Sequence, residues 1–293
     1  MHSHHVTRRQ FLKCSASVAA ALVSLPHAQV IAQQAKRTAV DQVALGQTGL
    51  KLSRLGIGIG SKGGSIQRNL GQEKFTRLIR YAYDQGISYI DTADGYKTHT
   101  MLREAIKELP REKLFIQSKM GGVPEKPLAE LDRFRKELGV DYIDSLLVHC
   151  TVKPTWNEDR KRLLDAFAEA KDKQIIRAHG VSCHSLPALC LAAQLDWVDI
   201  NLVRINPQGA HIDTPKETWN AQSNAAHLPP VLEQIRLMRQ QGHGIIGMKI
   251  IGDGDFTKAE DREKSIRFAM HCGLPHAVVI GFKNNAEIDA AID

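Results

Sequence analysis

The sequence has few aromatic residues, and this scarcity narrows its fold class. Phenylalanine, tryptophan and tyrosine make up 5% of the 293 residues, so aliphatic side chains carry most of the 43% hydrophobic content. Buried parallel strands have this aliphatic character because helices cover both of their faces. The chain is also long enough to bury one large core. These features favour an α/β protein.

Closely spaced cysteine pairs are missing as well. The five cysteines, at positions 14, 150, 183, 190 and 272, include no pair with the C-x-x-C spacing of zinc ribbons and thioredoxin-like sites. His149-Cys150 and Cys183-His184 follow neighbouring predicted strands. Successive side chains on a strand point to opposite faces, so we do not expect all four to converge. We predict no metal site and no disulfide.

A concentrated basic patch is also absent, although the net charge is +7. Part of the excess lies near the N-terminus, and elsewhere basic residues alternate with acidic ones, as at residues 111–113 and 158–161. Mixed charges of this kind are typical of solvated helix faces. We expect no nucleic-acid partner.

The N-terminal segment resembles a twin-arginine export signal. Residues 7–13 read Thr-Arg-Arg-Gln-Phe-Leu-Lys, and the apolar run at residues 15–25 is shorter than the roughly 20 residues that a membrane-spanning helix needs. We predict a signal peptide over residues 1–32 and a short linker over residues 33–42. The twin-arginine export machinery would then be a partner, and the processed protein would be periplasmic, with no stable membrane insertion. The alternative is an ordinary basic tail.

From residue 43 to residue 293, short apolar runs alternate with amphipathic segments. Strands are predicted at residues 55–60, 88–91, 114–119, 145–149, 178–181, 198–203, 244–249 and 277–280. Helices are predicted at residues 73–85, 100–107, 128–138, 160–173, 186–193, 229–241, 259–271 and 286–292. Eight strand–helix repeats over this length predict a single (β/α)₈ TIM barrel that covers residues 43–293.

The rival architecture is a doubly wound open sheet, which usually has a glycine-rich phosphate turn after its first strand. The glycines from Gly56 to Gly60 lie inside the first predicted strand and lack that spacing, so we interpret them as tight barrel packing. A predicted hairpin at residues 43–52 precedes this strand. It could close the bottom of the barrel.

Polar residues end several of the predicted strands. Asp91 ends the second strand, Lys119 the third and His149 the fourth, while Tyr96 lies in the turn after Asp91. In a barrel of this kind, the chemistry lies at the carboxyl ends of the strands. A charged residue that ends an apolar strand is costly unless it is paired. We therefore expect these side chains to share one site.

The residue types of this site suit proton transfer. A free tyrosine has a pKa near 10, and a neighbouring lysine favours the phenolate and so lowers that pKa. An aspartate would pair with the lysine, and a histidine would orient a substrate oxygen. We predict that Tyr96 is a general acid for reducing a carbonyl, or a general base for oxidising an alcohol.

Three segments resemble the aldo-keto reductase family. They read Asp-Thr-Ala-Asp-Gly-Tyr at residues 91–96, Phe-Ile-Gln-Ser-Lys at 115–119 and Asp-Tyr-Ile-Asp-Ser-Leu-Leu-Val-His at 141–149. The resemblance implies that Tyr96 is the acid/base, that Lys119 and Asp91 tune it, and that His149 orients the carbonyl. It also implies a nicotinamide dinucleotide across the barrel mouth.

The cofactor contacts of that family are matched less completely. The family usually has Ser-Asn after the fifth strand, where this sequence has Ser182-Cys183, and a glutamine on the sixth strand, near Asn201 or Leu202. The resemblance also implies that phosphate is bound after the eighth strand, at a helix N-terminus. The predicted cofactor-binding residues are Ser182, Asn201, Lys249, Gly281, Lys283 and Asn284. Lys283 would favour NADP over NAD.

The sequence thus predicts a monomeric NAD(P)-dependent oxidoreductase that reduces a carbonyl or oxidises an alcohol or sugar. Twin-arginine export carries folded proteins, which would allow a cofactor to be inserted first. The alternative is an exported barrel with weakened or lost nicotinamide binding that acts as a non-redox isomerase or lyase, or as a ligand-binding protein. The substituted nicotinamide contacts favour the alternative, and the complete set of Asp91, Tyr96, Lys119 and His149 favours the oxidoreductase.

Overall fold

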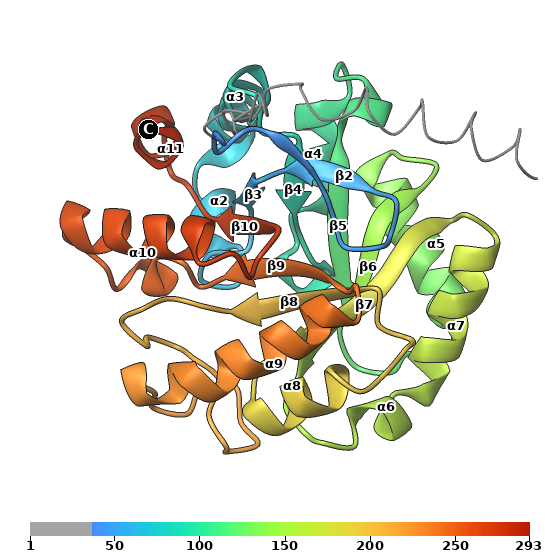
Figure 1. Ribbon diagram of the computed structural model, residues 1–293. Coiled ribbons are helices and arrows are strands. Elements are labelled where there is room, and N and C mark those ends of the chain that lie inside the picture. Colours follow the sequence, from blue (N-terminus) through green and yellow to red (C-terminus); the bar gives the residue numbers. More distant parts are fainter. Residues whose placement is uncertain (1–36) are drawn as a thin grey trace, which may run out of the picture. The chain divides into compact units, whose positions relative to one another are not determined.

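The computed structural model describes residues 37–293, in which eight parallel strands close into a barrel (Figure 1). Each strand pairs with the next along the chain, and the last pairs with the first, so the sheet has no open edge. The strands are β3 (Leu55–Gly58), β4 (Tyr89–Asp91), β5 (Phe115–Met120), β6 (Ile143–Thr151), β7 (Ile176–Cys183), β8 (Ile200–Arg204), β9 (Gly244–Met248) and β10 (Ala277–Ile280). This topology confirms the predicted (β/α)₈ barrel and excludes the doubly wound sheet.

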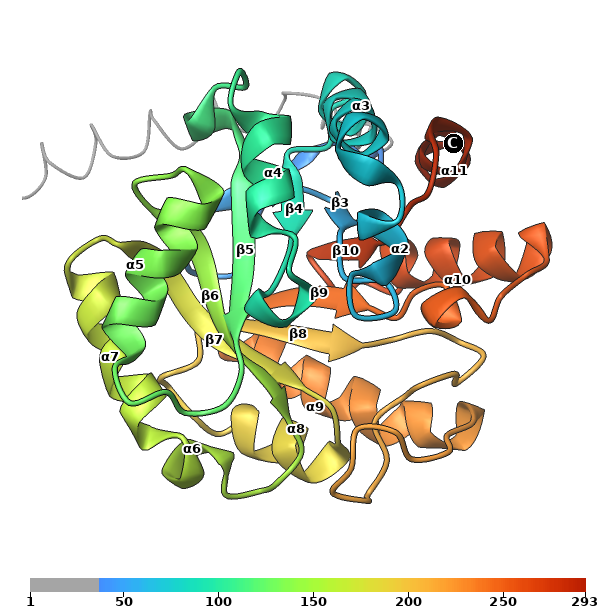
Figure 2. The same ribbon diagram turned by 180° about the vertical axis from the view of Figure 1, so that it is seen from behind.

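Helices lie outside the strands in both views of the ribbon (Figures 1 and 2). The α-helices are α2 (Ser65–Arg68), α3 (Gly71–Asp84), α4 (His99–Ile106), α5 (Pro127–Leu138), α6 (Trp156–Asp159), α7 (Lys161–Asp172), α8 (Leu186–Ala192), α9 (Leu228–Gln240), α10 (Ala259–His271) and α11 (Asn285–Ile292). Short 3₁₀ helices are η1 (Asp94–Tyr96), η2 (Arg111–Lys113), η3 (Ala225–His227) and η4 (Gly252–Gly254). All helices predicted from the sequence are present, whereas α2 and α6 were not predicted because a single turn shows no periodicity.

The alternation of side chains along the strands separates two hydrophobic clusters. On β8, Val203 points outward into the large cluster between the barrel and its helices. Its neighbour Leu202 points inward, into the smaller cluster that fills the barrel interior. The helices contribute the positions that a 3.6-residue period selects, such as Phe75 and Ile79 of α3. The barrel is therefore a filled core, and its chemistry is confined to its ends.

A hairpin closes the bottom of the barrel, as predicted from residues 43–52. Its strands are β1 (Gln42–Ala44) and β2 (Lys51–Ser53), which pair antiparallel. Leu45 and Leu50 belong to the interior cluster. The turn lies so close to the end of α9 that a Cβ on Gly46 would lie 2.4 Å from the carbonyl oxygen of Gly242. The carboxyl ends of the strands lie at the opposite end of the barrel.

The glycines of β3 allow the large side chains of its neighbours into the barrel. A Cβ on Gly56 would lie 2.1 Å from the ring of Tyr89, and one on Gly58 would lie 3.1 Å from the side chain of Val279. The interpretation of these glycines as tight packing is confirmed.

Two predictions concern membranes and export. No helix among residues 37–293 has the length and hydrophobicity that a bilayer crossing requires. The predicted signal peptide at residues 1–32 lies outside the described residues.

Candidate active site at the barrel mouth

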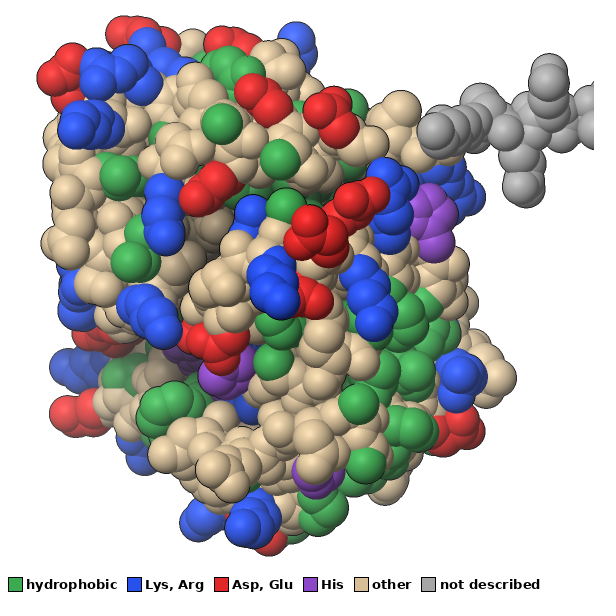
Figure 3. Space-filling view, turned by 90° about the vertical axis from the view of Figure 1, so that its left-hand side faces the viewer, with side chains coloured by type: hydrophobic (Ala, Val, Ile, Leu, Met, Phe, Trp, Pro, Cys, Tyr) green, Lys and Arg blue, Asp and Glu red, His purple; other side chains and the backbone are tan. Residues whose placement is uncertain are grey.

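The structure brings the predicted proton-transfer residues together at the carboxyl ends of the strands. Tyr89 of β4 belongs to the interior cluster, so Asp91, two positions later, points inward as well. The same period directs Lys119 of β5 and His149 of β6 into the mouth. Figure 3 shows the face toward which β8 and β9 point, where histidine side chains lie in a hollow with charged side chains at its rim.

Asp91 and Lys119 form a buried ion pair. Lys119 Nζ lies 2.7 Å from each carboxylate oxygen of Asp91 and also donates to the carbonyl oxygen of Thr92, at 2.8 Å. The Gln117 amide donates to Asp91 Oδ1 at 2.8 Å. Burial, the largest effect, lowers the pKa of Lys119, but attraction to Asp91 and Tyr96 more than offsets it, and the pKa is raised. Lys119 is therefore a fixed cation on the floor of the mouth.

Tyr96 lies on η1, against this ion pair. Its ring centroid is 5.0 Å from Lys119 Nζ and 5.6 Å from the centroid of the His149 ring. Gly60 makes room for the phenol, because a Cβ there would lie 2.3 Å from the Tyr96 ring. Burial raises the pKa of Tyr96, and Lys119 opposes this shift without reversing it. The expected lowering of this pKa is thus outweighed by burial, and Tyr96 is a protonated phenol at neutral pH.

Two arginines hold the turn that carries Tyr96. Arg68 donates to the carbonyl oxygen of Tyr96. Arg133 of α5 donates to Asp94 Oδ1 at 2.9 Å and is itself held by Glu137 at 2.6 Å. The backbone is thereby fixed on both sides of the phenol.

His149 is a neutral imidazole. Burial and then the positive charges of Lys119 and Arg160 lower the pKa of His149 to about 3. At neutral pH the ring can donate a hydrogen bond to an oxygen, but it cannot serve as a charged proton donor. Of the two rings, Tyr96 is therefore the one suited to transfer a proton.

A bulge in β6 changes the direction of Cys150. The register with β7 shifts between Val148 and Thr151, and Cys150 has a left-handed φ of 58°. Both His149 and Cys150 therefore lie at the mouth, although strict alternation would separate them. Cys183 instead belongs to the outer hydrophobic cluster. Within the described part of the chain, the four cysteines are unpaired thiols and no cluster of His, Cys, Asp and Glu is arranged to hold a metal.

A second buried ion pair lies on the β8 side of the mouth. Arg204 ends β8, and its Nε lies 3.4 Å from Oδ1 of Asp213, which is 0% exposed and comes from the loop after this strand. Neither carboxylate oxygen of Asp213 has a hydrogen-bond partner among residues 37–293. Burial raises the pKa of Asp213 to about 7, and Arg204 opposes this shift only in part. This carboxyl is therefore partly protonated at neutral pH.

Arg204 also determines which nitrogen of His184 carries a hydrogen. The guanidinium bonds His184 Nδ1 and can only donate, so Nδ1 accepts. Burial and then the charge of Arg204 lower the pKa of His184 well below its ordinary value, so the ring is neutral. Its hydrogen is therefore on Nε2, which donates to Ser182 Oγ at 3.2 Å. This arrangement leaves the hydroxyl hydrogen of Ser182 available for a ligand oxygen.

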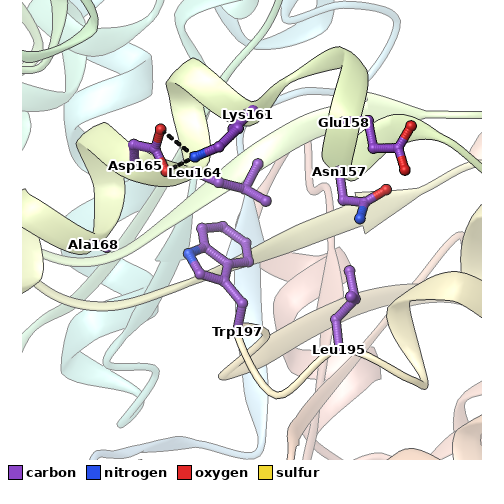
Figure 4. A pocket seen from close by; sticks show the side chains of 8 residues that line it. All are labelled: Asn157, Glu158, Lys161, Leu164, Asp165, Ala168, Leu195 and Trp197. Carbon is purple, nitrogen blue, oxygen red and sulfur yellow. Dashed lines mark hydrogen bonds and ion pairs between the residues drawn. The ribbon is translucent and has the colours of Figure 1, made fainter.

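Two hollows lie near these elements. A cleft of about 370 Å³ opens between the loops after β5 and β6, and Cys150 and Arg160 are among its lining residues. Another hollow, of about 300 Å³, lies outside the barrel beside α6 and α7, where Trp197 and Leu164 face each other (Figure 4). None of the predicted site residues lines either hollow, but Cys150, which follows His149 in the sequence, lines the first cleft. The first cleft is the one that adjoins the proton-transfer residues.

Comparison with known proteins connects this mouth to a family of enzymes. A sequence profile described as the Aldo/keto reductase family matches residues 54–288, which span the barrel from β3 into α11. The chain belongs to the aldo/keto reductase family. Its fold is that of solved aldo-keto reductases, and its tetrad of Asp91, Tyr96, Lys119 and His149 lies within the matched residues.

Individual relatives of this chain are distant. The chain is 29% identical over 169 residues to the NADH-specific methylglyoxal reductase of Escherichia coli (strain K12), with 49% of this chain and 52% of that protein covered. It is 30% identical over 166 residues to the 9,11-endoperoxide prostaglandin H2 reductase of Trypanosoma cruzi, with 54% of each covered. The chain thus spans about half the length of the curated relatives that it matches.

Solved structures resemble the barrel over most of its length. The holo form of an aldo-keto reductase from Bacillus halodurans has a TM-score of 0.68 at 17% identity and covers 86% of this chain and 90% of its own. An aldo-keto reductase from Brucella melitensis has a TM-score of 0.64 at 19% identity, with 87% and 93% covered. At these identities the likeness concerns the fold alone.

The predicted nicotinamide contacts of this chain divide into two groups. Ser182 points into the mouth, and Lys249 follows β9 with its ammonium 3.1 Å from Asp253. Asn201, by contrast, points outward, where its amide contacts His243 at 3.0 Å. Its prediction as a cofactor contact is therefore wrong, because the inward position of β8 is Leu202.

The predicted phosphate site at the N-terminus of α11 is occupied by the chain's own groups. Asn284 Oδ1 accepts from the backbone N–H of Glu287 at 3.0 Å, and the Glu287 carboxylate accepts from the backbone N–H of Lys283 at 2.8 Å. Gly281 lies just before this helix, so close to the loop after β3 that a Cβ would lie 2.0 Å from Ser61 Oγ. A carboxylate at this helix end opposes the binding of a further anion.

Arg204 and Asp213 were not among the predicted site residues. A signal for Arg204 exists, since an arginine at an inward position of an apolar strand requires a partner. Asp213 has none, because it lies in a long loop whose sequence has no periodicity. The connection that Arg204 makes to Ser182 through His184 depends on the folded structure.

Proposed function

We propose that this aldo-keto reductase is an NAD(P)-dependent oxidoreductase that reduces carbonyl compounds, with Tyr96 as general acid. The observation that carries the proposal is the position of the Tyr96 ring, whose centroid lies 5.0 Å from Lys119 Nζ and 5.6 Å from the centroid of the His149 ring. A protonated acid next to a cation that stabilises its anion suits reduction at neutral pH. Oxidation of an alcohol would need the phenolate, so its rate should rise with pH.

The side chains of the mouth would divide the work as follows. The His149 imidazole donates a hydrogen bond to the carbonyl oxygen and holds it next to Tyr96. A bound nicotinamide dinucleotide would supply the hydride to the carbonyl carbon. Tyr96 gives its proton to the oxygen, and Lys119 stabilises the phenolate that remains. Asp91 holds Lys119 in place through both carboxylate oxygens.

Residues at the mouth fit the nicotinamide end of the cofactor in part. The Ser182 hydroxyl has a hydrogen to donate to a carboxamide oxygen, and it is held in place by His184. Leu202, which is 1% exposed at the inward position of β8, offers no hydrogen bond. We therefore propose that Ser182 is the principal side-chain contact of the carboxamide.

For the choice between dinucleotides, the site favours NAD(H). The carboxylate of Glu287 at the start of α11 opposes a 2′-phosphate, which outweighs the suggestion of NADP from Lys283. The similar protein from Escherichia coli is named as NADH-specific. NADH should therefore bind at least as tightly as NADPH.

We also propose that residues 1–32 direct the folded protein through the twin-arginine machinery to the periplasm, on the basis of the Arg8-Arg9 motif and the apolar run. In that location a tightly held dinucleotide would have to be reoxidised and reduced on the enzyme. Loading before export would be consistent with this requirement. A processed protein that reaches the periplasm only through the twin-arginine route would support the proposal, and export of an Arg8→Lys/Arg9→Lys variant would contradict it.

A second candidate is a barrel that binds a ligand, or isomerises it, without nicotinamide. It is favoured by Leu202 in place of a polar contact and by the carboxylate of Glu287 at the phosphate end. Nucleotide binding decides between the two. We expect the exported protein to release a nicotinamide dinucleotide on denaturation, or to gain thermal stability when NADH or NADPH is added. No released nucleotide and no thermal shift with either would overturn the oxidoreductase proposal.

A further inference from the structure

The cleft beside His149 has the position of a substrate pocket. Its walls come from the loops after β5 and β6, the two strands that carry Lys119 and His149 at their carboxyl ends. Gly122 and Val123 form one wall, and Cys150, Val152 and Trp156 contribute to the other. A ligand whose carbonyl meets Tyr96 and His149 could place its remaining atoms here.

Arg160 is the feature of this cleft that most needs a partner. It lies between α6 and α7, it is half-buried, and its Nη1 donates a hydrogen bond to the carbonyl oxygen of Gly122, at 3.3 Å. Within residues 37–293 no carboxylate lies within ion-pair distance of it, although exposed Asp159 is its neighbour in sequence. A half-buried cation without a counter-charge is costly, which points to an anion that arrives with the ligand.

The charge of Arg160 reaches the residues of the mouth. It contributes to lowering the pKa of His149 and opposes the rise in the pKa of Cys150. Lys249 and Arg204 act on Cys150 in the same direction, and buried Asp213 opposes them. Lys249 is paired with Asp253 and Arg204 with Asp213, whereas Arg160 has no such acid. The charged residues that line the cleft are Lys153, Asp159 and Arg160, and Asp159 attracts Arg160 without forming an ion pair with it, so the cleft has a net positive charge.

We propose that Arg160 is a specificity-determining residue that binds a carboxylate of the substrate, so that the preferred substrates are short oxo acids. This inference rests on the proposed function for the reaction itself, but the binding site stands on its own geometry. A planar guanidinium matches a carboxylate with two parallel hydrogen bonds. The Gly122 contact holds Arg160 across the cleft and leaves its other N–H groups for the ligand. A phosphate dianion would be held less well, because the other cation of the cleft, Lys153, is exposed.

Paired substrates test this proposal. We expect kcat/KM for succinic semialdehyde to exceed that for its methyl ester, which is neutral, by about tenfold to a hundredfold, the range for a hydrogen bond to a charged group. Arg160→Gln should remove this preference, and Arg160→Lys should keep part of it. Lys161→Gln is the matched control, because it removes a neighbouring positive charge that is paired with Asp165 on the outer side of α7 (Figure 4).

Binding without turnover provides a readout that does not depend on the reaction. Titration calorimetry of the full-length protein with succinate should show binding by the wild type and by Lys161→Gln, and about tenfold or greater weakening in Arg160→Gln. This measurement still decides the matter if no nicotinamide reaction is found. The proposal would be overturned if wild type and Arg160→Gln preferred succinic semialdehyde over its methyl ester equally, or if the wild type did not bind succinate. It would also be overturned if kcat/KM were higher for glyceraldehyde phosphate than for succinic semialdehyde.

Discussion

The barrel mouth contains two buried acid–base pairs that differ in how well they are satisfied. Asp91 is bonded to Lys119 through both carboxylate oxygens and accepts from Gln117. Asp213 has no hydrogen bond from the described residues and lies 3.4 Å from the Arg204 Nε. The first pair keeps Lys119 charged, whereas the pKa of Asp213 rises to about 7. The charge of Asp91 outweighs the burial of Lys119, whereas the charge of Arg204 does not outweigh the burial of Asp213.

The two pairs also serve different purposes. The Asp91–Lys119 pair supports the acid Tyr96 directly. The Arg204–Asp213 pair acts through His184 on Ser182, which faces the ligand. The first pair should therefore control stability and chemistry together, and the second should control pH dependence and cofactor affinity.

Removing the acid of the first pair should have the largest effect on stability. Asp91→Asn leaves the ammonium of Lys119, which is 1% exposed, without its counter-charge. We expect a loss of about 3–5 kcal/mol in the free energy of unfolding, measured by urea denaturation. Asp213→Asn is the matched substitution, and at neutral pH it should cost about 1 kcal/mol or less. Equal losses in the two variants would remove the distinction between the pairs.

The second-largest expected difference between the two pairs is in the pH dependence of the free energy of unfolding. The raised pKa of Asp213 means that the folded protein holds this proton more tightly than the unfolded chain, whose pKa is about 3.9. The contribution of this proton to the free energy of unfolding is therefore complete below about pH 3.9, and it is lost as the pH rises through about 7. Between roughly pH 5 and roughly pH 8 the wild type should lose about 2 kcal/mol that Asp213→Asn does not lose. If the free energy of unfolding changed with pH in the same way in the wild type and in Asp213→Asn, the raised pKa of Asp213 would be contradicted.

The affinity for NADH should depend on the Arg204–Asp213 pair, because this pair orients Ser182 through His184. Ser182→Ala should weaken NADH binding about threefold to tenfold, the range for one neutral hydrogen bond, in a fluorescence titration. Asn201→Ala is the control, since Asn201 points away from the mouth and contacts His243. If Asn201→Ala weakens binding as much as Ser182→Ala does, the assignment of the two side chains is reversed.

The smallest expected effect concerns the phosphate end of the cofactor. Glu287→Gln should raise the affinity for NADPH relative to NADH about threefold, because it removes a negative charge at the N-terminus of α11. Asp289→Asn removes a charge from the same helix beyond its first turn and should leave the ratio nearly unchanged. A ratio that does not respond to Glu287→Gln would leave the cofactor preference to other residues.

The parts of the site that could be predicted from the sequence are those fixed by strand periodicity. Asp91, Lys119 and His149 each end an apolar strand, so the barrel itself places them together. Asn201 was assigned to the wrong face, because a one-residue uncertainty on β8 exchanges the inward and outward positions. Asp213 could not be predicted, since the loop after β8 brings it to Arg204 without any repeating pattern.

Local backbone features set the other limit on prediction. Alternation along β6 predicted that His149 and Cys150 point apart, but the left-handed φ of Cys150 places both at the mouth. The lowering of the Tyr96 pKa by Lys119 was inferred correctly in direction, yet the burial that outweighs it depends on packing around η1. The sequence indicates which groups meet, and the three-dimensional packing decides their protonation.

The most direct test of the central claim is a single turnover of NADH with an excess of aldehyde, followed by the near-ultraviolet absorbance of the reduced nicotinamide. The wild type should oxidise the bound NADH, and Tyr96→Phe should do so about a hundredfold or more slowly while binding NADH as before. Tyr81→Phe, which alters a tyrosine bonded to Asp289 outside the barrel, should match the wild type. A Tyr96→Phe protein that turns over at the wild-type rate would contradict the assignment of Tyr96 as the general acid.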